Sequence, residues 1–125
     1  MSLDISNHTN ATIPDVDFVG IKKAVLGDTY SLSLNFIGPK KIQVLNSSYR
    51  KKDEVTDILS FPLANDAGEI FICPTETRRQ SKNFGRDYKN FLAFLFIHGC
   101  VHLKGYDHGG TMEHIEAEIR RRFNI

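Results

Sequence analysis

Residues 87–105, "DYKNFLAFLFIHGCVHLKG", form the segment that most restricts how this chain can fold. Apolar residues fall on nearly every side of a helix drawn through it, so that helix would not rest on a surface with one face in water. Gly105 stands where a helix C-terminus commonly needs a left-handed residue. The pattern therefore predicts a buried central helix, around which the rest of a small protein is built.

The flanking segments predict a small mixed sheet of about four strands, with helices packed on it. Alternating or apolar runs predict short strands at 3–5, 30–38, 57–62 and 69–74. Apolar spacing or composition predicts further helices at 14–26, 39–50, 75–84 and 111–123. Pro14 is expected at a first helical position, while Pro62 and Pro74 are expected to end their strands. We therefore expect one α+β domain spanning residues 1–125.

Charge and apolar content exclude some classes of protein. Sixteen Lys and Arg stand against fifteen Asp and Glu, so the overall charge does not indicate a nucleic-acid binder. The longest apolar stretch is too short to span a bilayer, and the first residues do not resemble a signal peptide. Cys73 and Cys100 lie in apolar runs and are expected to be buried, reduced thiols. A cytoplasmic protein without a membrane segment is the expectation.

Basic residues gather locally in three clusters, at 50–52, at 78–82 with Arg86, and at 120–122. Such runs are usually solvated faces. If the first two flank a functional site, they would follow the backbone of an RNA strand, and binding would weaken with salt.

Two histidines of the central helix, His98 and His102, are four residues apart, so both rings project from one face. Gly105 then turns the chain, and His108 can return to the same point. Three imidazoles in this arrangement would hold one Zn²⁺, although nickel or copper would also bind such a set. Cys100 lies two residues from both helical histidines, which turns its thiol roughly 200° away from their shared face. We therefore expect a three-histidine metal site.

Three protein ligands leave one tetrahedral position open, as catalytic zinc sites do. A metal lowers the pKa of a water molecule bound there toward about 7, which provides a nucleophile or base at neutral pH. The alternative is that these histidines are ordinary core residues. It would bury three imidazoles in an apolar helix at a cost in free energy, so the spacing favours the metal site.

Gly99 follows His98 directly, at the position where HExxH zinc peptidases carry the glutamate that acts as general base. Glycine has no side chain that could accept a proton. Peptide hydrolysis by the usual route is therefore disfavoured, unless another carboxylate enters the site. Phosphodiester cleavage fits better, because a metal and an arginine can both stabilise charge on phosphate oxygens.

Two sequence blocks resemble a known family. They are "LNSSYRKKDEVTDILSFP" at 45–62 and "HGCVHLKGYDH" at 98–108, which resembles the string HGxLHLxGYDH. Between them "AGEIFIC" resembles a GD-I-x-I segment, with Glu69 in place of aspartate. On these motifs the chain resembles the YbeY family of metal-dependent endoribonucleases. It departs from the family pattern before residue 30, at Val55, where proline is common, and after Gly85, where a "GHS" stretch is absent.

The resemblance implies one α+β domain with a four-stranded sheet and a zincin-like central helix. It implies that His98, His102 and His108 bind the metal and that Arg50 is functionally important. The implied activity is single-strand-specific cleavage of RNA, in maturation of small-subunit ribosomal RNA and in ribosome quality control. Small ribosomal subunit proteins and a ribosome-associated GTPase are the partners that it suggests.

Two further side chains have alternative interpretations. Arg50 would orient or stabilise the scissile phosphate through its planar guanidinium, or it would form an ion pair with one of three carboxylates: Asp53, Glu54 or Asp57. Asp107 would orient a ligand histidine or accept a proton, or it would cap a turn.

Two other functions remain open. The first is a ribosome-assembly factor whose metal is mainly structural. The second is a metal-dependent hydrolase of another substrate, including a peptidase with a displaced base.

Overall fold

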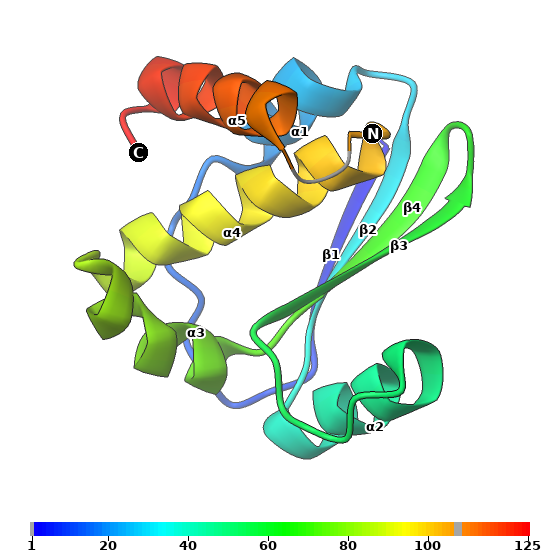
Figure 1. Ribbon diagram of the computed structural model, residues 1–125, viewed down its shortest axis with the longest axis vertical. Coiled ribbons are helices and arrows are strands. Elements are labelled where there is room, and N and C mark those ends of the chain that lie inside the picture. The colour runs from blue at the N-terminus through cyan, green and yellow to red at the C-terminus, as the bar shows by residue number, and fades with distance from the viewer. Residues whose placement is uncertain (1, 107–108) are drawn as a thin grey trace.

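The central helix, α4 (Tyr88–Leu103), organises the computed structural model, which describes residues 2–106 and 109–125 (Figure 1). Four strands form a sheet beside it: β1 (Leu3–Asn7), β2 (Ser31–Phe36), β3 (Ile58–Ala64) and β4 (Ala67–Ile72). The other α-helices are α1 (Phe18–Leu26), α2 (Pro39–Arg50), α3 (Pro74–Ser81) and α5 (Gly110–Phe123). A short 3₁₀ helix, η1 (Lys82–Phe84), follows α3. The α+β class and the mixed four-stranded sheet are confirmed.

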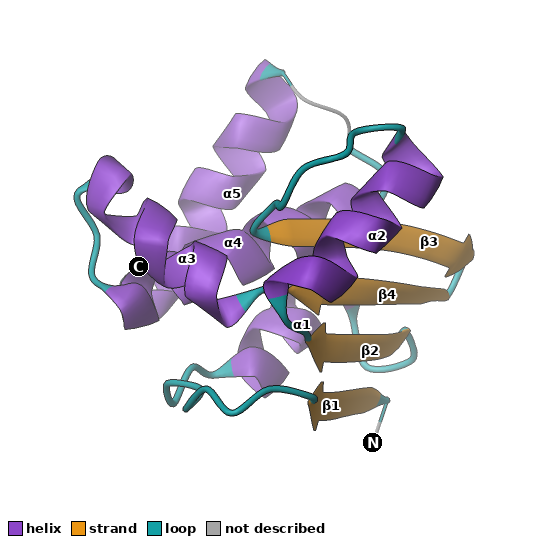
Figure 2. Cartoon of the chain, turned by 90° about the horizontal axis from the view of Figure 1, so that it is seen from below, coloured by secondary structure: helices purple, strands orange, loops and turns teal. Residues whose placement is uncertain are grey.

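The sheet has the strand order β1-β2-β4-β3. Strand β2 runs parallel to both β1 and β4, whereas β3 pairs antiparallel with β4 at one edge. Leu32, Leu34 and Phe36 of β2 are buried on the face that joins the main core. Helix α4 packs against α1, α3, α5 and β3, while α2 lies on the opposite side of the sheet (Figures 1 and 2).

Burial of α4 agrees with the prediction of a central helix. Between residues 91 and 103, ten of thirteen positions are buried, including Phe96, Ile97 and Val101, which are 0% exposed. The three positions that reach solvent in this range are Phe94, His98 and His102. They repeat every four residues, so they form one stripe along the helix. We call these three residues the α4 stripe.

Two boundary predictions based on prolines are wrong. Helix α1 begins at Phe18 rather than near Pro14, because the Asp17 carboxylate caps the helix by accepting a hydrogen bond from the Gly20 N–H at 2.9 Å. Strand β3 continues past Pro62 to Ala64. Because β3 is an edge strand and its register shifts beside this proline, the missing N–H does not end the strand.

None of the described helices is long and apolar enough to cross a membrane.

Candidate active site

A cleft of about 610 Å³ opens between the end of α2, the outer edge of β3 and the two histidines of the α4 stripe. It brings together three predicted site residues: Arg50 from α2, and His98 and His102 from α4. Aromatic, polar and aliphatic residues complete its wall, namely Tyr49, Thr56, Asp57, Ile58, Leu59, Ser60 and Phe61. The other two predicted site residues, Asp107 and His108, lie outside the described residues.

The position of Arg50 depends on how α2 ends. Lys51 adopts a left-handed conformation with φ 56°, and the Lys52 N–H donates to the Asn46 carbonyl oxygen at 3.3 Å. The Asn46 side chain, 1% exposed, donates to the Glu54 carbonyl oxygen at 3.0 Å. These bonds fold the loop after α2 back toward β3, so the helix C-terminus with Arg50 faces α4 across the cleft.

Arg50 does not form the alternative ion pair. Within the described residues, none of Asp53, Glu54 and Asp57 has a carboxylate oxygen within 4.0 Å of its guanidinium nitrogens. Asp53 instead accepts a hydrogen bond from Gln43 Nε2 at 3.1 Å. The Arg50 side chain is exposed at the mouth of the cleft, where it is available to an anionic ligand.

Glu116 on α5 is a site residue that the sequence reasoning missed. Its Oε1 lies 2.5 Å from Nδ1 of His98, and Glu116 is only 8% exposed. The signal was present in the sequence, because position 116 falls on the same buried face of α5 as Met112 and Ile119. A carboxylate on an apolar helix face needs a partner, and here the partner is a histidine.

Asp57 is a second missed residue. It lies in the cleft wall, and the sequence reasoning named it only as a partner for Arg50. Burial raises the pKa of its carboxyl, and repulsion from Glu76 adds to the increase; backbone N–H groups and His98 act in the opposite direction. Carboxyl groups with a raised pKa are common in functional clefts, so Asp57 is a candidate site residue in a cleft that His98 and His102 also line.

Gly99 packs against the sheet, next to β3 residues that also line the cleft. A Cβ atom added there would lie 2.9 Å from Ile58 Cδ1, 3.0 Å from Ser60 Oγ and 3.1 Å from Ile70 Cδ1. The glycine therefore lets α4 approach β3 and β4 closely. A glutamate at this position would not fit unless these side chains moved away.

The two cysteines are buried and free, as predicted. Cys100 is 0% exposed within the main core, and burial raises the pKa of its thiol well above the usual range. A thiol that resists ionisation in an apolar environment is a poor metal ligand.

The donor atoms at the cleft suit a metal ion. His98 and His102 line it together, and Glu116 holds Nδ1 of His98, so Nε2 is the nitrogen that His98 would offer to a metal. Carboxylate–histidine pairs of this kind orient the ring in metal sites. Within residues 2–106 and 109–125, no group of three or more His, Cys, Asp or Glu side chains is placed to hold a metal. The third predicted ligand, His108, is outside those ranges.

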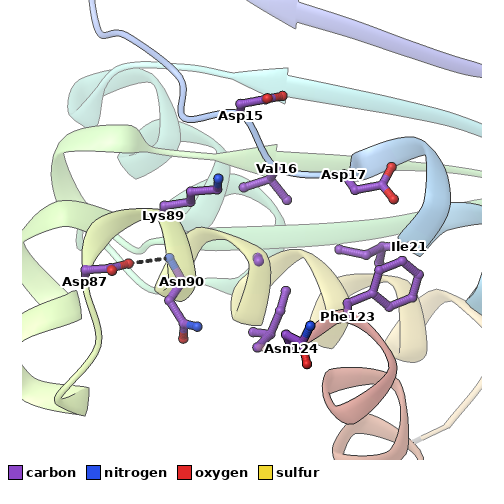
Figure 3. Close-up of a pocket in the computed structure, with 11 residues that line it drawn as sticks. Asp15, Val16, Asp17, Ile21, Asp87, Lys89, Asn90, Phe123 and Asn124 are labelled. Atoms are coloured by element: carbon purple, nitrogen blue, oxygen red, sulfur yellow. Dashed lines mark hydrogen bonds between the residues drawn. The ribbon is translucent and has the colours of Figure 1, made fainter.

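A second cavity, of about 370 Å³, lies between the starts of α1 and α4 and the end of α5 (Figure 3). Asp17 and Asp87 border it, but each carboxylate already serves as a helix cap. Asp17 accepts from the Gly20 N–H, and Asp87 accepts from the Asn90 N–H at 2.7 Å. Asp15 also lines this cavity, but among the described residues no histidine or arginine does, so we assign the chemistry to the cleft at His98 and His102.

Fold and site together define a class of small α+β proteins, in which a buried helix presents an i, i+4 histidine pair to a cleft beside an arginine. Residues 5–124 match the family model described as Endoribonuclease YbeY. The chain therefore belongs to the endoribonuclease YbeY family.

Several known proteins are similar to this chain. An endoribonuclease YbeY of Finegoldia magna is 42% identical over 88 residues, which cover 65% of this chain and 58% of that protein. Endoribonucleases YbeY of Staphylococcus aureus strains are 34% identical over 128 residues, covering 86% of this chain and 83% of theirs. The chain thus matches less than two thirds of the Finegoldia magna protein.

A solved structure shows the same fold. The solution structure of a Thermotoga maritima protein is similar with a TM-score of 0.66 and 23% sequence identity, covering 98% of this chain and 91% of that one.

Proposed function

We propose that this protein is a metal-dependent endoribonuclease that cleaves single-stranded RNA and acts in maturation of small-subunit ribosomal RNA and in ribosome quality control. The observation that carries the proposal is the convergence of Arg50, His98 and His102 on one cleft. Membership of the endoribonuclease YbeY family supports the same activity.

In this proposal, His98, His102 and His108 hold one ion. Zn²⁺ is the default for imidazole ligands, and other divalent transition metals suit them as well. When bound, the ion would act as a Lewis acid and lower the pKa of a water molecule toward about 7. Glu116 contacts Nδ1 of His98, so the other ring nitrogen, Nε2, would be the one available to hold the ion.

Arg50 would bind the phosphate at the scissile bond. Its guanidinium can donate two parallel hydrogen bonds to phosphate oxygens and stabilise charge that develops on them. Asp107 would either orient a ligand histidine or accept a proton. Ribosomal RNA is the proposed substrate in the cytoplasm, with small ribosomal subunit proteins and a ribosome-associated GTPase as candidate partners.

The test compares wild type with His98→Ala, purified in parallel. Metal content, cleavage of single-stranded RNA and binding to small ribosomal subunits are measured for both. We expect His98→Ala to lose metal and cleavage. His8→Ala serves as the matched control, because His8 is exposed and does not line the cleft; it should behave as wild type.

Each alternative function gives a different result. Full cleavage by His98→Ala would contradict catalysis at this metal site. Ribosome binding without cleavage by either protein would support an assembly factor with a structural metal. Peptide hydrolysis that stops on metal removal would support a different hydrolase.

A further inference from the structure

The first position of the α4 stripe, Phe94, is covered by two arginines. Arg86 Cζ lies 4.5 Å from the Phe94 ring centroid, and Arg120 Cζ lies 5.2 Å from the same centroid. Arg86 precedes α4 and donates a hydrogen bond to Asn90 Oδ1, whereas Arg120 comes from α5. Two cations from distant parts of the sequence therefore meet on one aromatic side chain.

Neither arginine forms a salt bridge among the residues that the structure describes. Within residues 2–106 and 109–125, neither Arg86 nor Arg120 has a carboxylate oxygen within 4.0 Å of its guanidinium nitrogens. Partial burial lowers the pKa of Arg86, and repulsion from Arg120 lowers it further. Contact with the ring accounts for part of the stability of each guanidinium, but it does not remove their mutual repulsion. An anion bound between the two guanidinium groups would reduce this repulsion.

The pair lies next to the proposed active site on the same helix face. Phe94 precedes His98 by four residues, so the two positions are roughly 6 Å apart along the axis of α4. Arg120 is likewise four residues from Glu116, which holds His98. Phe94, Arg86 and Arg120 do not line the cleft themselves, so an extended strand that leaves the cleft along α4 would bring a neighbouring phosphate to the two arginines.

We propose that Arg86 and Arg120 form a phosphate clamp that binds the backbone of single-stranded RNA beside the scissile phosphodiester. The inference rests on the proposed function, since it takes the cleft as the cleavage site. Planar guanidinium groups match phosphate oxygens in geometry and charge. The clamp contacts the backbone, so it would hold the strand without selecting its sequence.

The test measures binding of a 2′-O-methyl single-stranded oligonucleotide by fluorescence anisotropy at several salt concentrations. The clamp variant is Arg86→Gln/Arg120→Gln. The matched control is Arg121→Gln/Arg122→Gln, which removes the same charge from exposed positions of α5. The salt slope is the slope of the logarithm of the binding constant against the logarithm of the salt concentration. Each phosphate contact with a single strand contributes about 0.7 to the size of this slope. We expect the salt slope of the clamp variant to be smaller by about 0.7 and its binding to be roughly tenfold weaker. The salt slope of the control should fall by less.

A second variant separates charge from packing. Arg86→Lys/Arg120→Lys keeps both charges, so it should recover most of the salt slope that the glutamine variant loses. If the glutamine variant has a lower melting temperature but an unchanged salt slope, the arginines only stabilise the packing of α4 and α5, and the clamp is overturned. Equal slopes for the clamp and control variants would overturn it as well.

The readout also distinguishes the clamp from the proposed function. Binding of the modified oligonucleotide does not depend on cleavage. If wild type never cleaves RNA but the slope still falls in the clamp variant, the proposed function fails and the clamp stands. Metal-dependent cleavage with an unchanged slope would overturn the clamp alone.

Discussion

Glu116 determines, at the scale of single residues, how His98 can act. Its buried carboxyl group places Oε1 2.5 Å from Nδ1 of His98. An ionised carboxylate can only accept a hydrogen bond, so it would hold the ring in this orientation with the hydrogen on Nδ1. The affinity of the site for a metal should therefore depend on a residue that does not contact the metal.

Glu116→Gln should lower zinc affinity by about 10- to 100-fold, as losses of outer-shell partners do in other metal sites. Competition with a chromogenic chelator measures the affinity. Glu118→Gln is the control, because Glu118 is an exposed residue of the same helix. Equal zinc affinity for the two variants would show that Glu116 has no influence on the metal.

Gly99→Glu should destabilise the fold rather than create a peptidase. The side chain would overpack the contact with Ile58 and Ile70 and bury a carboxylate, so we expect a loss of at least about 3 kcal/mol in the free energy of unfolding. Urea denaturation measures it. Gly110→Glu is the control, since nothing lies within 4 Å of a Cβ atom there. A stable Gly99→Glu protein would contradict the close approach of α4 to the sheet.

Arg50→Ala should lower RNA cleavage by about 100-fold, the usual effect of losing one group that stabilises transition-state charge. Metal content should not change, because Arg50 is not a ligand in this account. Cleavage rate and bound zinc are measured on the same preparation, with Lys52→Ala as control. Loss of metal or of folded protein in Arg50→Ala would mark a structural role instead.

At the scale of elements, the position of Arg50 depends on how α2 ends as much as on the helix itself. The loop that returns to β3 depends on Asn46, whose side chain bridges to Glu54. Asn46→Ala should cost about 1–3 kcal/mol by removing a buried hydrogen bond, and it should reduce cleavage because Arg50 loses its fixed position. Ser47→Ala, at an exposed neighbour, is the control. Destabilisation without reduced cleavage would show that the loop does not position Arg50.

Elements with strong local patterns could be predicted from the sequence. Helix α4 was predictable because its residues are apolar all round, and β2 because its residues alternate. The start of α1 and the end of β3 could not be predicted from local patterns. Asp17 outweighs Pro14 as a start signal through a capping bond, and Pro62 is tolerated because β3 lies at the sheet edge. Edge position is a property of the assembled sheet, so it is not visible in the strand itself.

At the scale of the whole molecule, the cleft joins parts of the chain that are far apart in sequence. Spacing alone paired His98 with His102, because both lie on one helix. The family resemblance singled out Arg50. Glu116 and Asp57 were missed, since the contact of Glu116 with His98 and the position of Asp57 in the cleft wall depend on how α5 and the start of β3 lie relative to α4. Local patterns thus indicated the histidine pair that lines the cleft, and tertiary packing supplied the groups around it.

The most direct test of the account is a zinc titration of metal-free protein, followed by cleavage of single-stranded RNA. We predict that the metal-free protein does not cleave and that activity rises until about one zinc is bound per chain, as expected for a single catalytic site. His98→Ala should not recover activity at any zinc level. Cleavage at the full rate by metal-free wild type would contradict the central claim.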